Sequence, residues 1–445
     1  MTGKKNLTFW QMWNLSFGFL GVQIAYALQS ANISRIFATL GADPHQLSFF
    51  WILPPLMGMI VQPLIGKWSD RTWTRMGRRK PYLLVGAIVA VLVMVLLPNA
   101  GSLNLSTAYV FLGLNAAMWF GLFSLIFLDT SINVAMQPFK MMVGDMVNEE
   151  QKARAYSIQS FLCNTGSLFG YLFPIFFTWI GIANEAPEGQ VPASVITSFY
   201  VGAAVLIICV LYTFLKVKEM PPAEYAEFHG IDPAKAADGK SEGLLKLLAK
   251  APRTFWTVGL VQFFCWAAFL YMWTYSNGTL AFNCWGGVTD TASKAYQAAG
   301  NWVGVAFAVQ AVGSILWATV LPKFKNLKAA YVVSLLIGAA GFAALMFIHD
   351  KYIACGAYFL IGAAWAAMLA LPFTLLTNAL EGNPHMGSYL GLFNCTICLP
   401  QIIAAATGGL VLKLVGGSQA TMLGVAGILL VLGALSVRLI DTKKQ

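Results

Sequence analysis

The feature that most constrains this chain is a series of long apolar runs from which charged residues are almost excluded. Only 10% of the 445 residues are charged, against about 25% in soluble domains. A run of about 20 apolar residues is long enough to span a bilayer as a helix. Twelve such runs lie at 9–31, 47–66, 81–98, 112–138, 155–182, 194–215, 255–275, 299–321, 329–347, 352–376, 386–410 and 418–438. The pattern predicts an all-α membrane protein with 12 transmembrane helices.

The positions of the basic residues predict how these spans are oriented. If both termini are cytoplasmic, 24 of the 28 Lys and Arg lie on the cytoplasmic side. The exceptions are Arg35, Lys294, Lys351 and Lys413. Cytoplasmic loops of membrane proteins are enriched in basic residues, so we expect both termini inside. The net charge of +10 follows from this bias and favours contact with anionic membrane lipid; no feature favours nucleic acid.

The longest polar stretch divides the chain into two halves of six predicted spans each. We expect an N-terminal half at 1–215, a cytoplasmic central loop at 216–253 and a C-terminal half at 254–445. This plan is typical of secondary transporters built from repeats. No phosphate-binding loop is present, which argues against ATP-driven pumping. No small-residue cleavage site follows the first apolar run, so we expect that span to be retained.

Cysteines and histidines give no indication of a metal or cofactor. Of the seven cysteines, only Cys284 lies in a predicted outer loop, so we expect no disulfide framework. Cys395 and Cys398 form a C-x-x-C inside an apolar helix, where small residues at a helix contact are the more common explanation than a metal or redox site. We therefore expect no cofactor, no metal and no enzyme.

Asp129 is the only acidic side chain deep inside a predicted span. A carboxylate there costs about 3 kcal/mol on insertion scales, and intramembrane acids commonly serve proton relays or polar substrates. The alternative is a structural Asp satisfied by neighbouring hydroxyls or amides. On a helix, Asp129, Asn133, Gln137 and Lys140 fall within an arc of about 80°. Asp129 and Lys140 are roughly 16 Å apart along a straight helix, so we expect Lys140 near the cytoplasmic mouth rather than beside Asp129.

Other spans carry amide and aromatic side chains, which bind sugar hydroxyls and the C–H face of a sugar ring. The candidate substrate-binding residues are Gln23, Tyr26, Gln29, Gln62, Asn133, Gln137, Trp266, Trp273, Asn394 and Gln401. Singly, each is equally compatible with a helix–helix hydrogen bond or an interfacial aromatic. Together, so many amides within membrane spans indicate a polar, uncharged ligand.

The loop from Gly66 to Pro81 joins the second and third predicted spans. A glycine allows helices to approach closely, an Asp can pair with arginines or a helix N-terminus, and a basic cluster suits helix C-termini and anionic lipid. The alternative is a positive cluster with a purely topological role. We predict a cytoplasmic latch formed by Gly66, Asp70, Arg71, Gly77, Arg78, Arg79, Lys140 and Asp145.

This loop resembles the signature of the major facilitator superfamily, with four extra residues between Asp70-Arg71 and Gly77. Its R-x-G-R-R-x-P form is similar to the plant sucrose transporters and their animal and bacterial relatives, the glycoside–cation symporters. The resemblance continues over most of the chain, at Gln23, Tyr26, Gln29, Trp51, Pro54, Gln62, Asp129, Asn133, Pro138, Asp145, Trp266, Asn394 and Gln401. Two departures are that Gln137 falls one residue later than the family's glutamine, and that Lys140 replaces an arginine. Lysine keeps the charge but loses bidentate hydrogen bonding.

The resemblance implies the major facilitator fold and a secondary active transporter that imports an α-glucoside such as maltose or sucrose. It implies proton symport through Asp129 with alternating access. We expect a monomer in the plasma membrane, most simply a bacterial inner membrane because the loops are short. A sodium-coupled glycoside symporter and a transporter-like sugar sensor remain alternatives. Related sodium-coupled families use extra acids in spans two and four, whereas span two here offers only Gln62, which favours protons.

Overall fold

The computed structural model describes residues 6–103, 110–221, 223–225, 248–380, 389 and 392–441, with the side chains of residues 70, 71, 149, 152 and 153 left out. Its described part is nearly all helical and contains no strand. The helices of the first half are α1 (Phe9–Thr39), α2 (Pro44–Phe50), α3 (Leu53–Arg71), α4 (Lys80–Leu96), α5 (Ala116–Met146), α6 (Glu149–Trp179) and α7 (Ala193–Lys216). Those of the second half are α10 (Arg253–Cys284), α11 (Lys294–Val320), α12 (Leu327–Leu345), α13 (Lys351–Ala379), α15 (Cys395–Leu414) and α16 (Gln419–Ser436).

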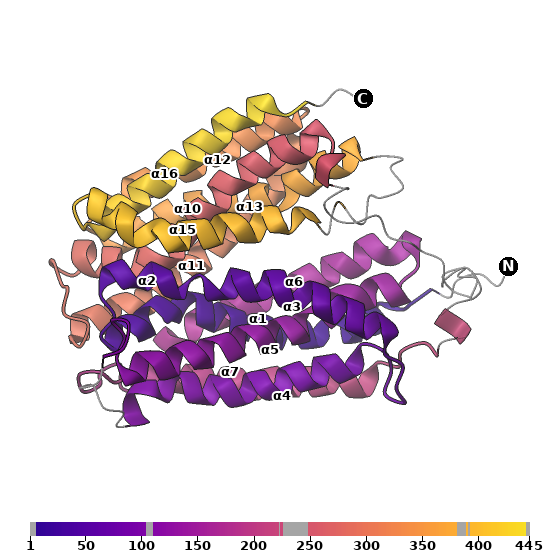
Figure 1. Ribbon diagram of the computed structural model, residues 1–445, viewed down its shortest axis with the longest axis horizontal. Helices are drawn as coiled ribbons and strands as arrows, with labels where there is room; N and C mark the ends of the chain where they lie inside the picture. The colour runs from indigo at the N-terminus through magenta and orange to yellow at the C-terminus, as the bar shows by residue number, and fades with distance from the viewer. Residues whose placement is uncertain are drawn as a thin grey trace.

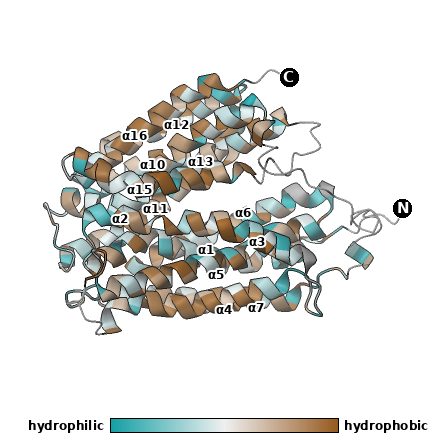
Figure 2. Cartoon of the chain, viewed as in Figure 1, coloured by the Kyte–Doolittle hydropathy of each residue, from teal (hydrophilic) through white to brown (hydrophobic). Residues whose placement is uncertain are grey.

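These helices confirm the prediction of an all-α membrane protein. Among the described residues, 11 helical segments are long and apolar enough to cross a membrane. Helix α1 is not one of them, because its glutamines, asparagines and serines lower its hydropathy; at 31 residues it is nevertheless among the longest and most buried helices. With α1, the twelve predicted spans are accounted for. Figure 2 shows predominantly hydrophobic helix shafts with hydrophilic segments gathered toward their ends.

The predicted bounds are wrong at three helices that matter for the site. Helix α10 continues to Cys284 rather than ending at residue 275, so Cys284 is the last residue of a helix instead of lying in a loop. The other two are α1 and α5. Helix α1 continues to Thr39 rather than ending near residue 31, so Arg35 is buried within it instead of lying in a loop. Helix α5 continues through Pro138 to Met146 instead of ending at 138. In both cases hydropathy falls while the helix goes on: the polar residues of α1 are buried by other helices, and Gln137 of α5 lies beside Gly66 of α3. The second span is interrupted at Trp51 and Ile52, between α2 and α3.

The two halves lie side by side, and the start of α1 and the end of α16 lie at the same end of the bundle (Figure 1). We call this the termini end. The predicted central loop falls mostly outside the described residues. Its boundaries therefore stay a prediction.

Between described residues, the hydrogen bonds that join the halves are all at the end opposite the termini. They come from the last turns of α1, from α2, and from the end of α6 and the loop after it. They meet the C-terminal half of α10, the start of α11 and the end of α15. The bonded pairs are Ser34–Trp273, Arg35–Gln297, Arg35–Asn301, Thr39–Gln297, His45–Gly409, Thr178–Asn301 and Glu185–Lys294. We call this set the seam.

Glycines allow the helices of the first half to pack closely. The Gly166-x-x-x-Gly170 spacing on α6 indicates a close helix contact, and the structure confirms it: Gly170 lies against α1. A Cβ on Gly170 would lie 2.7 Å from both the Ile24 carbonyl oxygen and the Ala27 Cβ. Helix α1 is thereby held firmly against α6.

Gly170→Ala should therefore lower the thermal unfolding midpoint of the purified protein, because overpacking a tight contact costs about 1–3 kcal/mol. Gly356→Ala on α13 is the matched control, since no atom lies within 4 Å of the added Cβ. Alanine is also favoured over glycine in a helix by about 0.5–1 kcal/mol, so the control should melt at an equal or higher temperature. Equal melting of the two variants would contradict the tight contact.

Candidate functional site

Asp129 lies in the middle of α5, with 2% of its surface exposed. Its Oδ1 accepts a short hydrogen bond from Nε2 of Gln29 on α1. The other carboxyl oxygen, Oδ2, and Oε1 of Gln29 are buried and make no hydrogen bond with the described residues. One amide donor thus satisfies the carboxyl group only in part, and two acceptor oxygens remain open to a proton or to a donor on a ligand.

A chain of polar side chains continues from Asp129 toward the termini end. Asn133 Nδ2 donates to the Asp129 backbone carbonyl at 2.8 Å. Gln62 Nε2, from α3, donates to Asn133 Oδ1 at 2.7 Å. Lys140 Nζ then lies 3.5 Å from Gln62 Oε1. The structure therefore brings four of the predicted site residues into one continuous group, with Lys140 separated from Asp129 as expected.

Lys140 is exposed, whereas Tyr26 of α1 is half-buried and packs against the apolar core.

The remaining predicted amides have other neighbours. Gln23 Oε1 lies 3.5 Å from Ser167 Oγ on α6, and Gln137 lies beside Gly66 of α3. On α15, Gln401 Nε2 donates to the carbonyl of Ile397 at 3.0 Å, and Asn394 Nδ2 lies 3.7 Å from Cys398 Sγ. In this conformation the two α15 amides are bonded within their own helix.

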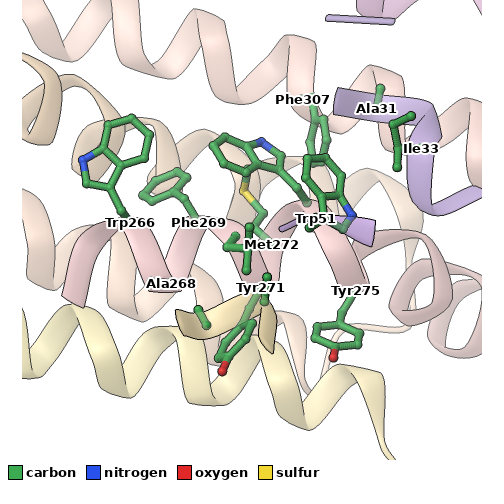
Figure 3. Packing of buried hydrophobic residues seen from close by; sticks show 14 of the residues in the cluster. Ala31, Ile33, Trp51, Trp266, Ala268, Phe269, Tyr271, Met272, Tyr275 and Phe307 are labelled. Atoms are coloured by element: carbon green, nitrogen blue, oxygen red, sulfur yellow. The ribbon is translucent and has the colours of Figure 1, made fainter. Parts of the chain in front are cut away.

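Aromatic rings of α10 and α13 form a layer in the second half, which Trp51 of the first half joins. Trp365 of α13 packs edge-on against Trp266 and Trp273 of α10, at centroid distances of 5.6 and 5.9 Å. Trp51, from the first half, stacks on Trp273 with an interplanar angle of 17°. The labelled Trp266, Phe269 and Trp51 follow one another along this layer in Figure 3. Trp266 Nε1 is buried and has no partner among the described residues, so it offers a donor to a ligand.

We call the polar group on α1, α3 and α5 of the first half the polar wall, and the aromatic layer on α10 and α13 of the second half the aromatic wall. The polar wall supplies mainly amide and carboxyl groups; the aromatic wall supplies flat apolar faces and one free indole donor. A molecule with many hydroxyls and an apolar ring face matches both walls. The arrangement has no nucleophile–base pair, and the described residues contain no group of three His, Cys, Asp or Glu able to hold a metal.

The predicted latch is an ordered cluster at the termini end of the first half. Arg79 Nε donates to Asp145 Oδ2 at 2.8 Å, and Arg79 Nη1 bonds to Ser69 Oγ. Arg78 Nε donates to the Ser69 carbonyl at 3.2 Å, and its guanidinium lies 4.6 Å from the Tyr225 ring centroid. The structure therefore joins α3, α4 and α5 here. The side chains of Asp70 and Arg71 lie outside the described residues.

Glu219, just after α7, completes this cluster. Its carboxylate accepts the backbone N–H groups of Arg78, Arg79 and Lys80 at 2.7 to 3.0 Å, which caps the start of α4. Gly77 has a φ of +119°, and any side chain there would collide with Glu219. Burial raises the pKa of Tyr225, so its protonated hydroxyl can donate to Asp145 Oδ1 at 3.3 Å.

Two residues of these clusters were not predicted from the sequence. Glu219 gave no signal beyond its position in a charged loop. The predicted bounds of the first span placed Arg35 in an outer loop. The apolar residues Ile33, Ile36 and Phe37 on either side of it are nevertheless compatible with a helix that continues past residue 31. A search for unusually polar but uninterrupted helices would have found it.

Comparison with known proteins identifies one family over most of the chain. The family model of the Major Facilitator Superfamily matches residues 15–405. Sucrose transport protein SUT5 of Oryza sativa subsp. indica is 24% identical over 432 residues, covering 87% of this chain and 79% of that protein. The human proton-associated sugar transporter A is 30% identical over 152 residues, covering 34% of this chain. The matches span only 20% to 28% of the human, rat and mouse proteins of that name.

Solved structures agree on the fold. The D-xylose-proton symporter superposes with a TM-score of 0.68 at 15% identity, over 98% of both chains. A bacterial homolog of the human lysosomal transporter Spinster, in an inward-facing and occupied conformation, superposes with a TM-score of 0.66 at 15% identity, over 97% of this chain and 96% of that one. At these identities the likeness concerns the fold alone.

Proposed function

The chain belongs to the Major Facilitator Superfamily, and we propose that it imports a di- or oligosaccharide, an α-glucoside such as maltose or sucrose, by proton symport. The observation that carries this proposal is the buried carboxyl group of Asp129, which has one oxygen bonded to Gln29 and the other unbonded to any described residue. An isolated acid inside a membrane span is a typical proton-carrying group. The names of the sucrose and proton-associated sugar transporters support the same substrate class.

In this proposal Asp129 couples the transport of the proton to the transport of the sugar. Protonation removes the cost of a buried charge and gives the carboxyl group a hydrogen-bond donor. A sugar hydroxyl can then bond to Asp129 or to the free Oε1 of Gln29, while Trp266 and Trp273 face the apolar side of the sugar. Substrate and proton therefore stabilise one another's binding.

The positions of the contacts between the halves support alternating access as part of this proposal. The seam closes the end opposite the termini. With the termini in the cytoplasm, as the basic residues indicate, the structure corresponds to a conformation closed to the outside. Rocking of one half against the other would open the seam and bring the termini ends together.

The test is uptake of radiolabelled maltose and of sucrose into proteoliposomes with an imposed proton gradient. We expect accumulation of at least one sugar that is independent of sodium and collapses when a protonophore is added. Accumulation that requires a sodium gradient would favour the sodium-coupled alternative. Sugar binding without uptake would favour a sensor, and neither binding nor uptake of either sugar would contradict the proposed substrate class.

A further inference from the structure

Arg35 is the central cation of the seam. It lies near the end of α1 with 1% of its surface exposed. Its Nε donates to Gln297 Oε1 at 2.7 Å and its Nη1 to Asn301 Oδ1 at 2.8 Å. Its Nη2 donates to Asn184 Oδ1 at 2.8 Å and to the Gln297 backbone carbonyl at 2.9 Å. One guanidinium therefore makes three of its four hydrogen bonds to the opposite half.

All four acceptors are neutral. A buried charge is normally compensated by an opposite charge, because desolvation is expensive. Here amide and carbonyl oxygens replace the missing carboxylate, and each bond from a charged donor is worth about 1.5–3 kcal/mol. Three of these bonds exist only while α11 lies against α1. When the halves separate at this end, Arg35 loses them together.

The surroundings of Arg35 are built to receive it. Gly300 lies directly against the guanidinium, and a Cβ there would come within 2.5 to 2.8 Å of its Nε, Cδ and Cζ. The acceptor amides are themselves oriented across the seam: Gln297 Nε2 donates to Thr39 Oγ1 at 3.1 Å, and Asn301 Nδ2 donates to Thr178 Oγ1 at 2.7 Å. Gln297 Nε2 also donates to the Thr291 carbonyl of its own half at 2.7 Å, and both amides leave their oxygens for Arg35.

We propose that Arg35 is the residue that holds the outer end closed, acting as a positioning residue for the transport cycle. Its guanidinium and the amides of Gln297 and Asn301 form an outer gate, and breaking their bonds is the main cost of opening it. The proposal rests on the alternation between two conformations proposed above. It does not depend on the sugar or on proton coupling.

The test measures opening of the seam directly. Ser48 on α2 has 1% of its surface exposed and lies against Gly408 of α15, but it is not bonded to Arg35. In Ser48→Cys, the rate at which N-ethylmaleimide alkylates the introduced thiol, followed by peptide mass spectrometry, reports how often this end opens. Adding Arg35→Gln should raise that rate by about tenfold or more, since loss of about 1.4 kcal/mol already changes a population tenfold.

The matched control is Lys294→Ala, made in the same Ser48→Cys background. Lys294 and Glu185 also pair across the seam, at 2.8 Å, but both side chains are exposed, and such pairs contribute little. The alkylation rate of this control should stay within about twofold of the parent. Sugar is absent from the assay, so its outcome is separate from that of the uptake experiment.

A merely structural role would lower the melting temperature without exposing the introduced thiol in the folded protein. An unchanged alkylation rate in folded Arg35→Gln would therefore overturn the proposal. If Arg35→Gln does not fold, Asn301→Ala removes one acceptor and leaves Arg35 in place. It should raise the rate by a smaller factor, and no increase there would likewise overturn the gate.

Discussion

Asp129→Asn is expected to abolish concentrative sugar uptake in proteoliposomes while leaving sugar exchange intact. Asparagine keeps the Oδ1 acceptor for Gln29 Nε2, so the contact between α1 and α5 survives. The substitution removes the only carboxyl group that is buried in the middle of a span among the described residues. Counterflow of labelled sugar, which needs no gradient, should continue and should become insensitive to pH.

Thr130→Val is the matched control for this experiment. Thr130 is the next residue on α5 and bonds to Met57 Sδ at 3.3 Å, but it does not titrate. This variant should accumulate sugar as the wild type does. Gradient-driven accumulation by Asp129→Asn at the wild-type level would rule out Asp129 as the coupling group. Asp129 would then be a structural residue that hydrogen-bonds to its neighbours.

Asp145→Ala is expected to lower the free energy of unfolding by about 3 kcal/mol, because it removes the carboxylate to which the buried Arg79 Nε donates at 2.8 Å. The side chain of Arg79 is 2% exposed and that of Asp145 is 18% exposed. Glu219 stays near Arg79 and will limit the loss. The measurement is the thermal unfolding midpoint of the purified protein in detergent.

Arg75→Ala controls for the loss of a charge in the same loop. Arg75 is exposed, and exposed substitutions away from special features usually change stability by less than about 0.5 kcal/mol. If Asp145→Ala melts at the same temperature as Arg75→Ala, the Arg79–Asp145 pair does not stabilise the junction of α4 and α5.

Hydropathy predicted the fold because most helices meet lipid along one face, where polar residues are costly. Hydropathy failed to predict the ends of helices that have little contact with lipid. Most residues of α1 are buried by other helices, so Asn32, Ser34 and Arg35 end the apolar run without ending the helix. A similar cause applies to α5, where the half-buried Gln137 lies beside Gly66 of α3 rather than in a loop.

The sequence could indicate which residues belong to the candidate site, but not which of them form hydrogen bonds with one another. Helical periodicity placed Asp129 and Asn133 on one face, and Gln29 on a face of the first span. Nothing in the sequence says that Gln29 meets Asp129, 100 positions away, because this depends on how α1 packs against α5. The acceptor role of Glu219 likewise depends on the end of α7 meeting the start of α4.

The neutral partners of Arg35 have an electrical consequence. An arginine is always ionised, and within a membrane span its charge lies in the transmembrane field. A unit charge that crosses the whole field exchanges about 2.3 kcal/mol per 100 mV. No carboxylate bonded to Arg35 moves with it to cancel this energy. Any displacement of α1 along the membrane normal therefore carries gating charge, and the membrane voltage acts on the seam even when no proton is bound.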